Sequence, residues 1–447
     1  MAISSPRARL SQRRLPTQGC SQGQPAVDSA FTRLLLLCAF SPSIAIRCKP
    51  LSNANLRHPT AAKSSRQADV VQSGNTAYAR GRDCSSVSRF LLPKCRTGQH
   101  RLLPNSSFKN RGSGGSRGPC AATADVSADV STATELPPFL PKEAELLEDP
   151  DAKKLARRIR RLPVMTSLAA EPIDSSFVGP DWAGRSDGPK VGSSDPPVVL
   201  LAGFDSSCLE YRRLLPQLER GGSEVWAVDL IGWGFSSATE GKGPAVSSFG
   251  PAAKREHLYS FWKTYMKRPM VLVGSSLGGA VAVDLALEHP DAVDRLVLLD
   301  AQVFIDGVGN RANLPRWLAN AGVQFLRSWP LRAYAGGLAF YNRAEATKGA
   351  TQAGRLHCLM PGWPEAMMSF MSSGGYSLTA RLPQLDRPSL VLWGRQDRIL
   401  EPSYALRFEK ELARSRLEWV EESGHLPHIE QPELVAEKIR QYAAESL

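Results

Sequence analysis

The chain has 447 residues, enough for one large domain or several small ones, and a formal net charge of +12. The charge is uneven, because residues 1–120 carry 19 Lys and Arg against three acids, whereas residues 121–447 have a net charge of −4. The positive charge is therefore a property of the N-terminal segment and does not indicate a nucleic-acid-binding protein. Only Cys208 and Cys358 lie beyond residue 120, so no disulfide framework is predicted.

The segment 1–120 has the composition of an organelle transit peptide. It is rich in Ser, Arg, Gly and Pro and poor in acids, and its apolar run at 34–40 is too short to span a bilayer. We therefore predict that residues 1–120 are a disordered transit peptide, most like a chloroplast one, with processing near Cys120. A basic tail that stays attached is the alternative. The predicted location is the chloroplast, in the stroma or associated with the thylakoid.

Residues 121–195 are expected to hold a leader, one helix and the first strands. The helix is predicted over 142–161, after Pro141 and ending in a basic run that suits the negative end of a helix dipole. Two short strands are expected near 164–169 and 173–178. A polar linker with little apolar content then leads to the core.

From residue 196 onward, apolar runs alternate with helical patterns. Several of these runs are apolar throughout, as strands buried on both faces of a parallel sheet must be. The alternation predicts an α/β fold with a doubly wound, mostly parallel sheet, divided between residues 196–304 and 386–447. The expected strands are 198–201, 225–228, 271–273, 296–299, 390–393 and 417–420.

The alternation stops between residues 305 and 385, where no strand is expected. This stretch contains half of the eight methionines and many aromatic residues, and its pattern predicts helices around 314–326, 330–341 and 363–371. One interpretation is ordinary helical core. The other is a lid over the site, with flexible Met and aromatic side chains facing an apolar ligand.

The most informative motif is Gly274-Ser275-Ser276-Leu277-Gly278, between an apolar strand and a small-residue helix. A serine on such a turn adopts a strained conformation that lifts its hydroxyl clear of the sheet, and flanking glycines allow strand and helix to approach. Ser276 is the predicted nucleophile. The Leu277 N–H, at the helix N-terminus, is a predicted oxyanion donor. A second match, Gly114–Gly118, lies in a polar stretch with no strand before it and is read as chance.

A serine nucleophile needs a base and an orienting acid. His425 is the preferred base, because Gly-His directly after the last strand places an imidazole on a strand-end loop; His428 is the competitor. Asp397, just past the strand 390–393, is the preferred acid, and the chain order Ser, Asp, His is the one this topology uses. Asp300, at the end of an earlier strand, is the runner-up acid.

Two loops that follow strands complete the predicted site. The backbone N–H of Phe204, after Gly203, is the second expected oxyanion donor; an ordinary turn is the alternative. The block Asp229–Ser236 has the spacing Gly-x-Gly after a strand, but Ser237 stands where a dinucleotide site needs a third glycine.

Taken together, residues 196–445 resemble the α/β-hydrolase superfamily, in its esterase and carbon–carbon hydrolase branch. The resemblance implies Ser276 as nucleophile, His425 as base, Asp397 as acid, and Phe204 and Leu277 as oxyanion donors. It also implies a helical cap at 305–385, inserted after the sixth strand, and makes Asp229–Ser236 a structural loop. The family usually has His-Gly in its first block, and Ala202 replaces that histidine here. Five blocks carry the resemblance: Leu201-Ala202-Gly203-Phe204, Asp229-x-x-Gly232-x-Gly234-x-Ser236, Gly274-x-Ser276-x-Gly278-Gly279, Trp393-Gly394-x-x-Asp397 and Gly424-His425-x-Pro427.

The sequence thus predicts a serine hydrolase that cleaves a lipophilic ester through an acyl-enzyme. The chloroplast address makes the chain similar to plant chloroplast α/β-hydrolases, a group that includes dephytylating esterases. No metal or organic cofactor and no nucleic-acid partner is expected, and peripheral membrane contact is left open. Two alternatives remain: a carbon–carbon bond hydrolase with the same triad, and a catalytically silent ligand-binding protein on the same fold.

Overall fold

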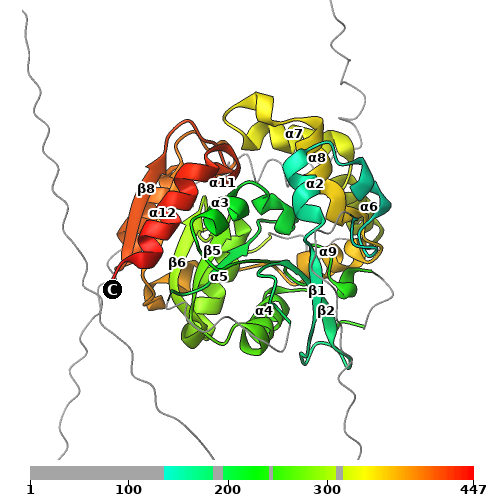
Figure 1. Ribbon diagram of the computed structural model, residues 1–447, viewed down its shortest axis with the longest axis horizontal. Coiled ribbons are helices and arrows are strands. Elements are labelled where there is room, and N and C mark those ends of the chain that lie inside the picture. The colour runs from blue at the N-terminus through cyan, green and yellow to red at the C-terminus, as the bar shows by residue number, and fades with distance from the viewer. Residues whose placement is uncertain (1–134, 185–194, 241–244, 309–315, 447) are drawn as a thin grey trace, which may run out of the picture. The chain divides into compact units, whose positions relative to one another are not determined.

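The computed structural model describes residues 135–184, 195–240, 245–308 and 316–446. These residues form an eight-stranded sheet with the order β1-β2-β4-β3-β5-β6-β7-β8, flanked by helices (Figure 1). The strands are β1 Arg160–Val164, β2 Ile173–Val178, β3 Val198–Leu201, β4 Val225–Val228, β5 Met270–Ser275, β6 Val293–Leu299, β7 Ser389–Gly394 and β8 Ser415–Val420. The transit-peptide prediction for residues 1–120 lies outside the described residues.

The predicted α/β class and mostly parallel sheet are confirmed. Strands β3 to β8 pair in parallel, whereas β1 and β2 join the edge in antiparallel orientation. Every residue of β3, β4, β5 and β7 is buried, because helices cover both faces of the central strands. The carboxyl ends of these parallel strands share one edge of the sheet, where α/β folds place their sites.

The helices of the core follow the strands. Helix α3 packs on α12, and α4 packs on α5. The core elements are η1 Lys142–Leu146, α2 Pro150–Ala156, η2 Cys208–Tyr211, α3 Leu214–Arg220, η3 Ser237–Thr239, α4 Pro251–Tyr265, α5 Leu277–Glu288, η4 Pro290–Ala292, α10 Ser403–Glu411, α11 Pro427–Glu430 and α12 Pro432–Ala444. In the described ranges, none of the helices has both the length and the apolar composition needed to cross a bilayer.

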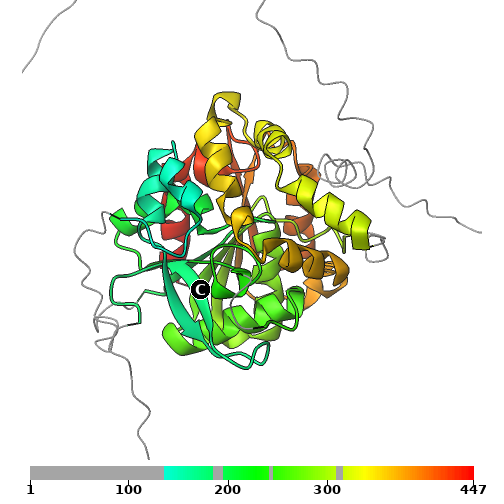
Figure 2. The ribbon, with the colours of Figure 1, turned by 90° about the vertical axis from the view of Figure 1, so that its right-hand side faces the viewer.

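Between β6 and β7 the described residues contain helices and loops but no strand. These elements, which we call the cap, are α6 Arg316–Leu326, α7 Trp329–Ala339, η6 Arg343–Glu345, α8 Lys348–Arg355, η7 Leu356–Leu359, α9 Trp363–Ser372 and η8 Thr379–Gln384. Helix α7 packs on α8 and α6 packs on α9, so the cap helices lie together (Figures 1 and 2). The three helices expected in this stretch are present, and α8 was not expected.

The prediction of one helix over 142–161 is wrong. The chain forms two short helices instead, because Asp149 caps α2 by accepting hydrogen bonds from the N–H groups of Asp151 and Ala152. The basic run that was expected to end the helix continues into β1. There Arg160 pairs opposite Phe177 and its guanidinium lies over that ring. A charged edge strand of this kind resists pairing with other chains.

The strand expected near 164–169 is displaced, because β1 ends at Val164. The strand expected at 173–178 is present as β2. The segment before β1 also contacts the cap, since α2 lies against α8 (Figure 1) and the Glu148 N–H donates a hydrogen bond of 2.9 Å to Gln352.

Candidate active site

Ser276 lies on a sharp turn between β5 and α5. Its backbone has φ 49° and ψ −119°, a region that a residue with a side chain adopts only under strain of order 1–3 kcal/mol. The Ser276 N–H donates to the Leu299 oxygen at 2.9 Å, and its own oxygen accepts from the Gln302 N–H at 2.8 Å. These hydrogen bonds to β6 and to the loop after it hold the turn in its strained form.

Glycines around this turn allow backbones to approach closely. A Cβ on Gly278 would lie 2.3 Å from the Leu201 oxygen, and a Cβ on Gly274 would lie 2.3 Å from the Gly278 oxygen. A Cβ on Gly203 would lie 3.3 Å from the Ser276 Cβ, so the loop after β3 passes beside the serine. The turn and the predicted oxyanion loop therefore meet at one point of the sheet edge.

His425 and Asp397 are brought together. His425 Nδ1 lies 2.8 Å from Asp397 Oδ2, and both side chains are buried. The other oxygen of Asp397 accepts from the N–H groups of Ile399 and Leu400 at 2.7 and 3.1 Å. With Nδ1 facing the carboxylate, Nε2 of His425 is left to face the cavity, which Ser276 also lines.

The competing histidine, His428, faces a different group. Its Nε2 lies 3.2 Å from Oε1 of Glu210, and its ring lies 5.1 Å from the Tyr211 ring, tilted by 40°. The second oxygen of Glu210 accepts a hydrogen bond of 3.1 Å from the Gly203 N–H. Burial would raise the pKa of Glu210, but the His428 imidazole and the Gly203 N–H outweigh it and lower that pKa. Sequence reasoning missed Glu210, because nothing in its local sequence marks a glutamate seven residues after Gly203.

The runner-up acid, Asp300, is fully buried beside Asp397. Its Oδ1 accepts a hydrogen bond of 2.9 Å from the Gly394 N–H. Its Oδ2 has no hydrogen-bond partner among the described residues. Burial, and then the neighbouring Asp397 carboxylate, raise the pKa of Asp300 well above its usual range. This shift favours the neutral form of Asp300 beside the His–Asp pair.

The two predicted oxyanion donors belong to backbone segments next to Ser276. Leu277 is the first residue of α5, so its N–H precedes the intrahelical hydrogen bonds. Phe204 follows Gly203 in the loop after β3, and its ring packs at 5.5 Å on Trp233 and 6.0 Å on Phe370. The loop is thereby fixed on one side by Glu210 and on the other by aromatic packing.

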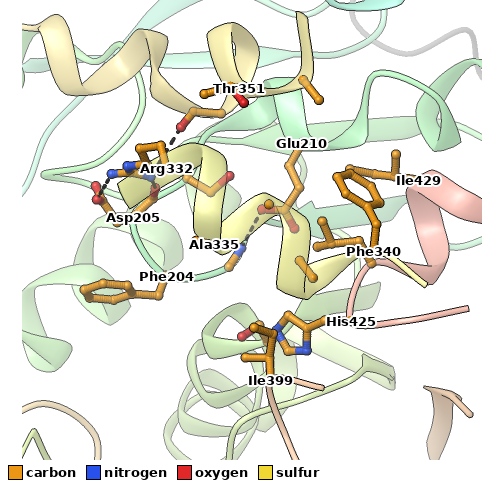
Figure 3. A pocket seen from close by; sticks show the side chains of 18 of the residues that line it. Phe204, Asp205, Glu210, Arg332, Ala335, Phe340, Thr351, Ile399, His425 and Ile429 are labelled. Atoms are coloured by element: carbon orange, nitrogen blue, oxygen red, sulfur yellow. Dashed lines mark hydrogen bonds and ion pairs between the residues drawn. The ribbon is translucent and has the colours of Figure 1, made fainter. Parts of the chain in front are cut away.

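A cavity of about 260 Å³ opens at this edge of the sheet, and the side chain of His425 lies in it (Figure 3). Its wall is mostly apolar and comes from both the core and the cap. The apolar lining residues include Phe204, Leu209, Leu326, Leu331, Ala335, Ala339, Phe340, Ala346, Ala350, Ile399, Leu426 and Ile429. A smaller number of polar side chains also line the wall, among them Asp205, Glu210, Arg332 and Thr351.

Asp205, the residue after Phe204, ties the oxyanion loop to the cap. It forms an ion pair with Arg332 of α7 (Figure 3), lies 3.0 Å from His357 Nε2, and accepts from Trp363 Nε1 at 2.7 Å. Burial would raise the pKa of Asp205, but Arg332 and His357 outweigh it and hold that pKa at about 2. Burial opposes protonation of His357, yet its neighbours Cys358 and Asp205 raise the His357 pKa to about 10.

Two groups of potential metal ligands come together in the described ranges. One is Asp205 with His357 and Cys358, and the other is Asp300 with Asp397 and His425. In each group a histidine and an aspartate are already within hydrogen-bond distance of each other, at 3.0 and 2.8 Å. Histidine–aspartate pairs of this kind form buried ion-pair networks and catalytic dyads without a bound metal ion.

The block Asp229–Ser236 forms a loop held by the buried Asp229 carboxylate. That carboxylate accepts from the N–H groups of Cys208 and Phe235 at 2.7 and 3.0 Å. Gly232 and Gly234 have φ values of 86° and 72°, which explains both glycines as turn formers. The resemblance to a dinucleotide motif is therefore accounted for by local structure.

Comparison with known proteins identifies the family of this chain. The sequence pattern of the Alpha/beta hydrolase family matches residues 198–438. The Arabidopsis thaliana alpha/beta hydrolase domain-containing protein VTE7 is 43% identical over 315 residues, which are 70% of this chain and 91% of that protein. The chloroplastic pheophytinase of the same plant is 22% identical, over 54% of this chain and 59% of that protein. A thermophilic esterase from Thermogutta terrifontis shares the fold, with a TM-score of 0.51, 22% identity and coverage of 63% of this chain and 97% of that one. The chain therefore belongs to the alpha/beta hydrolase family.

Proposed function

We propose that this protein is a serine hydrolase that cleaves a lipophilic ester through a Ser276–His425–Asp397 triad. The observation that carries the proposal is the 2.8 Å contact between His425 and Asp397 at a cavity that the strained Ser276 turn also lines. A nucleophile on a strained turn and a base oriented by a buried acid are the parts that acyl transfer requires.

In the proposed mechanism, Nε2 of His425 takes the proton of the Ser276 hydroxyl as Oγ attacks the ester carbonyl carbon. The oxyanion that forms is stabilised by the N–H groups of Phe204 and Leu277. His425 then gives the proton to the departing alcohol, which leaves an acyl-enzyme. A water molecule, deprotonated by the same imidazole, attacks this ester, and the acid is released with Ser276 restored. Asp397 holds the imidazole in the tautomer that makes these transfers feasible.

The lipophilic nature of the substrate is proposed from the wall of the cavity. Apolar side chains of α6 and α7 and apolar residues of the core make up most of the wall, and polar side chains such as Asp205 and Glu210 make up a smaller part. Such a lining favours an aliphatic or isoprenoid group over a charged one. A chloroplast location is part of the proposal; it is supported by the composition of residues 1–120 and by the plant relatives, one of which is named chloroplastic.

The test is hydrolysis of p-nitrophenyl esters of increasing acyl length by the full chain. We expect kcat/KM to rise with chain length and to fall by about 10³-fold or more in Ser276→Ala and His425→Ala. His289→Ala is the matched control, because His289 stacks on Tyr259 outside the cavity and its loss should leave hydrolysis unchanged. Unchanged turnover in Ser276→Ala would refute the proposal. Tight ligand binding without turnover would favour a ligand-binding protein, and product analysis on a diketone would reveal carbon–carbon hydrolysis.

A further inference from the structure

The segment that contains α6 and α7 has an unusual surface. Residues 316–344 include four arginines and no acidic residue, whereas residues 121–447 as a whole carry a small excess of acids. Trp317 is 73% exposed and Tyr334 is 55% exposed. Large aromatic side chains normally bury most of their area, so this degree of exposure indicates a surface that meets another phase or partner.

The exposed aromatics are confined to this segment. Among the described residues, every exposed large aromatic side chain lies between residues 317 and 341, namely Trp317, Phe325, Trp329, Tyr334 and Tyr341. The other exposed large apolar side chains are aliphatic and scattered over other elements: Leu146, Met165, Leu406 and Leu434. Single exposed aliphatic residues are ordinary, but a run of exposed aromatics in one segment is not.

Both helices have one face toward the protein and one toward solvent. On α6, Trp317 and Phe325 share a stripe with the exposed Ala321, because residues four apart lie above one another, while Val323 is buried. On α7, Leu331 and Ala335 line the catalytic cavity and Tyr334 is exposed. Helix α7 therefore contributes both to the wall of the cavity and to the outer surface of the cap.

We infer that the α6–α7 segment docks on an anionic lipid surface, with its exposed aromatic rings at the headgroup boundary and with Arg327 and Arg343 toward lipid phosphates. Trp and Tyr favour this boundary because one part of each ring system is apolar and another forms hydrogen bonds. Each basic residue near an anionic surface adds about 1 kcal/mol. Arg343 is exposed beside Tyr341, and Arg327 is half-buried between the two helices.

Charge decides between a bilayer and a second copy of this chain. Arg332 is already paired with Asp205, and residues 316–344 contain no carboxylate that could pair with Arg327 or Arg343 of a second copy. Self-association through this face would therefore bring like charges together. An anionic lipid surface offers negative charge for the arginines and an apolar layer for the aromatic rings. This inference rests on the proposed function in one respect: docking would place the wall of the cavity next to a lipophilic ester dissolved in the bilayer.

The experiment measures quenching of tryptophan fluorescence by brominated lipids in phosphatidylcholine vesicles with and without phosphatidylglycerol. A simple binding measurement is unsuitable for the full chain, since residues 1–120 carry a net charge of +16 and would themselves attach to anionic vesicles. Quenching reports which tryptophan enters the lipid. Of the nine tryptophans, Trp317 and Trp329 are the exposed ones in the described ranges.

We expect quenching in anionic vesicles and loss of more than about half of it in the double variant Trp317→Phe, Trp329→Phe. Trp419→Phe, on β8, is the matched control and should keep the quenching. Arg343→Glu should weaken quenching in anionic vesicles and not in neutral ones. Equal quenching in the wild type and the double variant, or none in vesicle-bound protein, would overturn the inference. So would a concentration-dependent dimer that the double variant loses, because it would assign the face to a second copy. Short-chain ester hydrolysis by the same variants separates these outcomes from a failure of the proposed function, since neither tryptophan lines the cavity.

Discussion

The buried carboxylate of Glu210 accepts a hydrogen bond of 3.1 Å from the N–H of Gly203, the residue before the proposed oxyanion donor Phe204. The Gly203 N–H belongs to the peptide unit just before the one that carries the Phe204 N–H, so this hydrogen bond restrains the loop next to the proposed donor. At the position before Gly203, where the resemblance leads one to expect histidine, the chain has Ala202. Glu210, with His428 behind it, supplies the loop with a polar anchor of another kind.

Removing that anchor should slow catalysis more than it weakens binding. We expect Glu210→Ala to lower kcat by about 10- to 100-fold with little change in KM, because a misplaced oxyanion donor acts on the transition state. Glu210→Gln keeps an oxygen that can accept from Gly203 and should retain most of the activity. Steady-state kinetics on a soluble ester, with Tm measured alongside, check this. If both variants lose kcat equally, the hydrogen bond to Gly203 is not the reason.

Asp300 should behave as a neutral acid. In Asp300→Asn the amide oxygen can accept from Gly394 and the amide N–H can replace the carboxyl proton facing Asp397, so we expect kcat within about threefold of the wild type and an unchanged acid limb of the pH profile. Asp300→Ala removes both interactions beside the His–Asp pair and should cost about tenfold in kcat. An inactive Asp300→Asn variant, or one whose acid limb shifts, would contradict this assignment.

The contact between His357 of the cap and Asp205 predicts how the stability of the protein depends on pH. The His357 pKa is raised to about 10, above its ordinary value near 6.5, so the stabilisation from His357 is complete below about pH 6.5 and is lost as the pH rises through 10. We expect the free energy of unfolding of the wild type to fall over this window by an extra 1–3 kcal/mol, roughly, relative to His357→Gln. Denaturant unfolding of both proteins at pH 6 and pH 9.5 provides the comparison. Parallel pH curves for the two proteins would argue against a charged His357.

The glycines of the nucleophile turn and of the cap should respond oppositely to alanine. Gly278→Ala places a Cβ 2.3 Å from a main-chain oxygen, so we expect a loss of about 3 kcal/mol or more, or failure to fold. Gly337→Ala, in α7, meets nothing within 4 Å and should stabilise the protein by about 0.5–1 kcal/mol. Thermal unfolding of both variants tests the pair. A tolerated Gly278→Ala would mean that strand and helix lie further apart than described.

The parts of the fold that follow local rules were predicted from the sequence. The apolar runs marked the central strands of the parallel core, because strands buried on both faces must be apolar throughout. The half-exposed edge strand β8 was also predicted, from the shorter pattern at 417–420. Helix α8 was missed since its residues Lys348–Arg355 are mostly small or polar; its one local signal is Thr347, whose hydroxyl accepts from the Ala350 N–H at 3.1 Å. The helix predicted over 142–161 failed because Asp149 starts a new helix and its carboxylate also pairs with Arg212.

The same distinction between local signals and distant contacts applies to the residues of the candidate site. Ser276, Asp397 and His425 stand in a chain order with local signals, and their catalytic roles remain predictions until they are tested. Glu210 and Asp205 could not be found in advance, since their roles come from contacts with residues far along the chain: His428 for Glu210, and Arg332 and His357 for Asp205. Asp300 was considered as an alternative acid, but only its burial beside Asp397 indicates that it is protonated.

The most direct test of the account is covalent labelling with a fluorophosphonate, followed by mass spectrometry of the labelled peptide. Ser276→Ala is compared with Ser275→Ala, its neighbour on the same turn, which is a buried serine with no proposed role in the reaction. We expect the wild type and Ser275→Ala to be labelled on Ser276, and Ser276→Ala to remain unlabelled. Absence of labelling in folded wild-type protein, or undiminished labelling of Ser276→Ala, would contradict it.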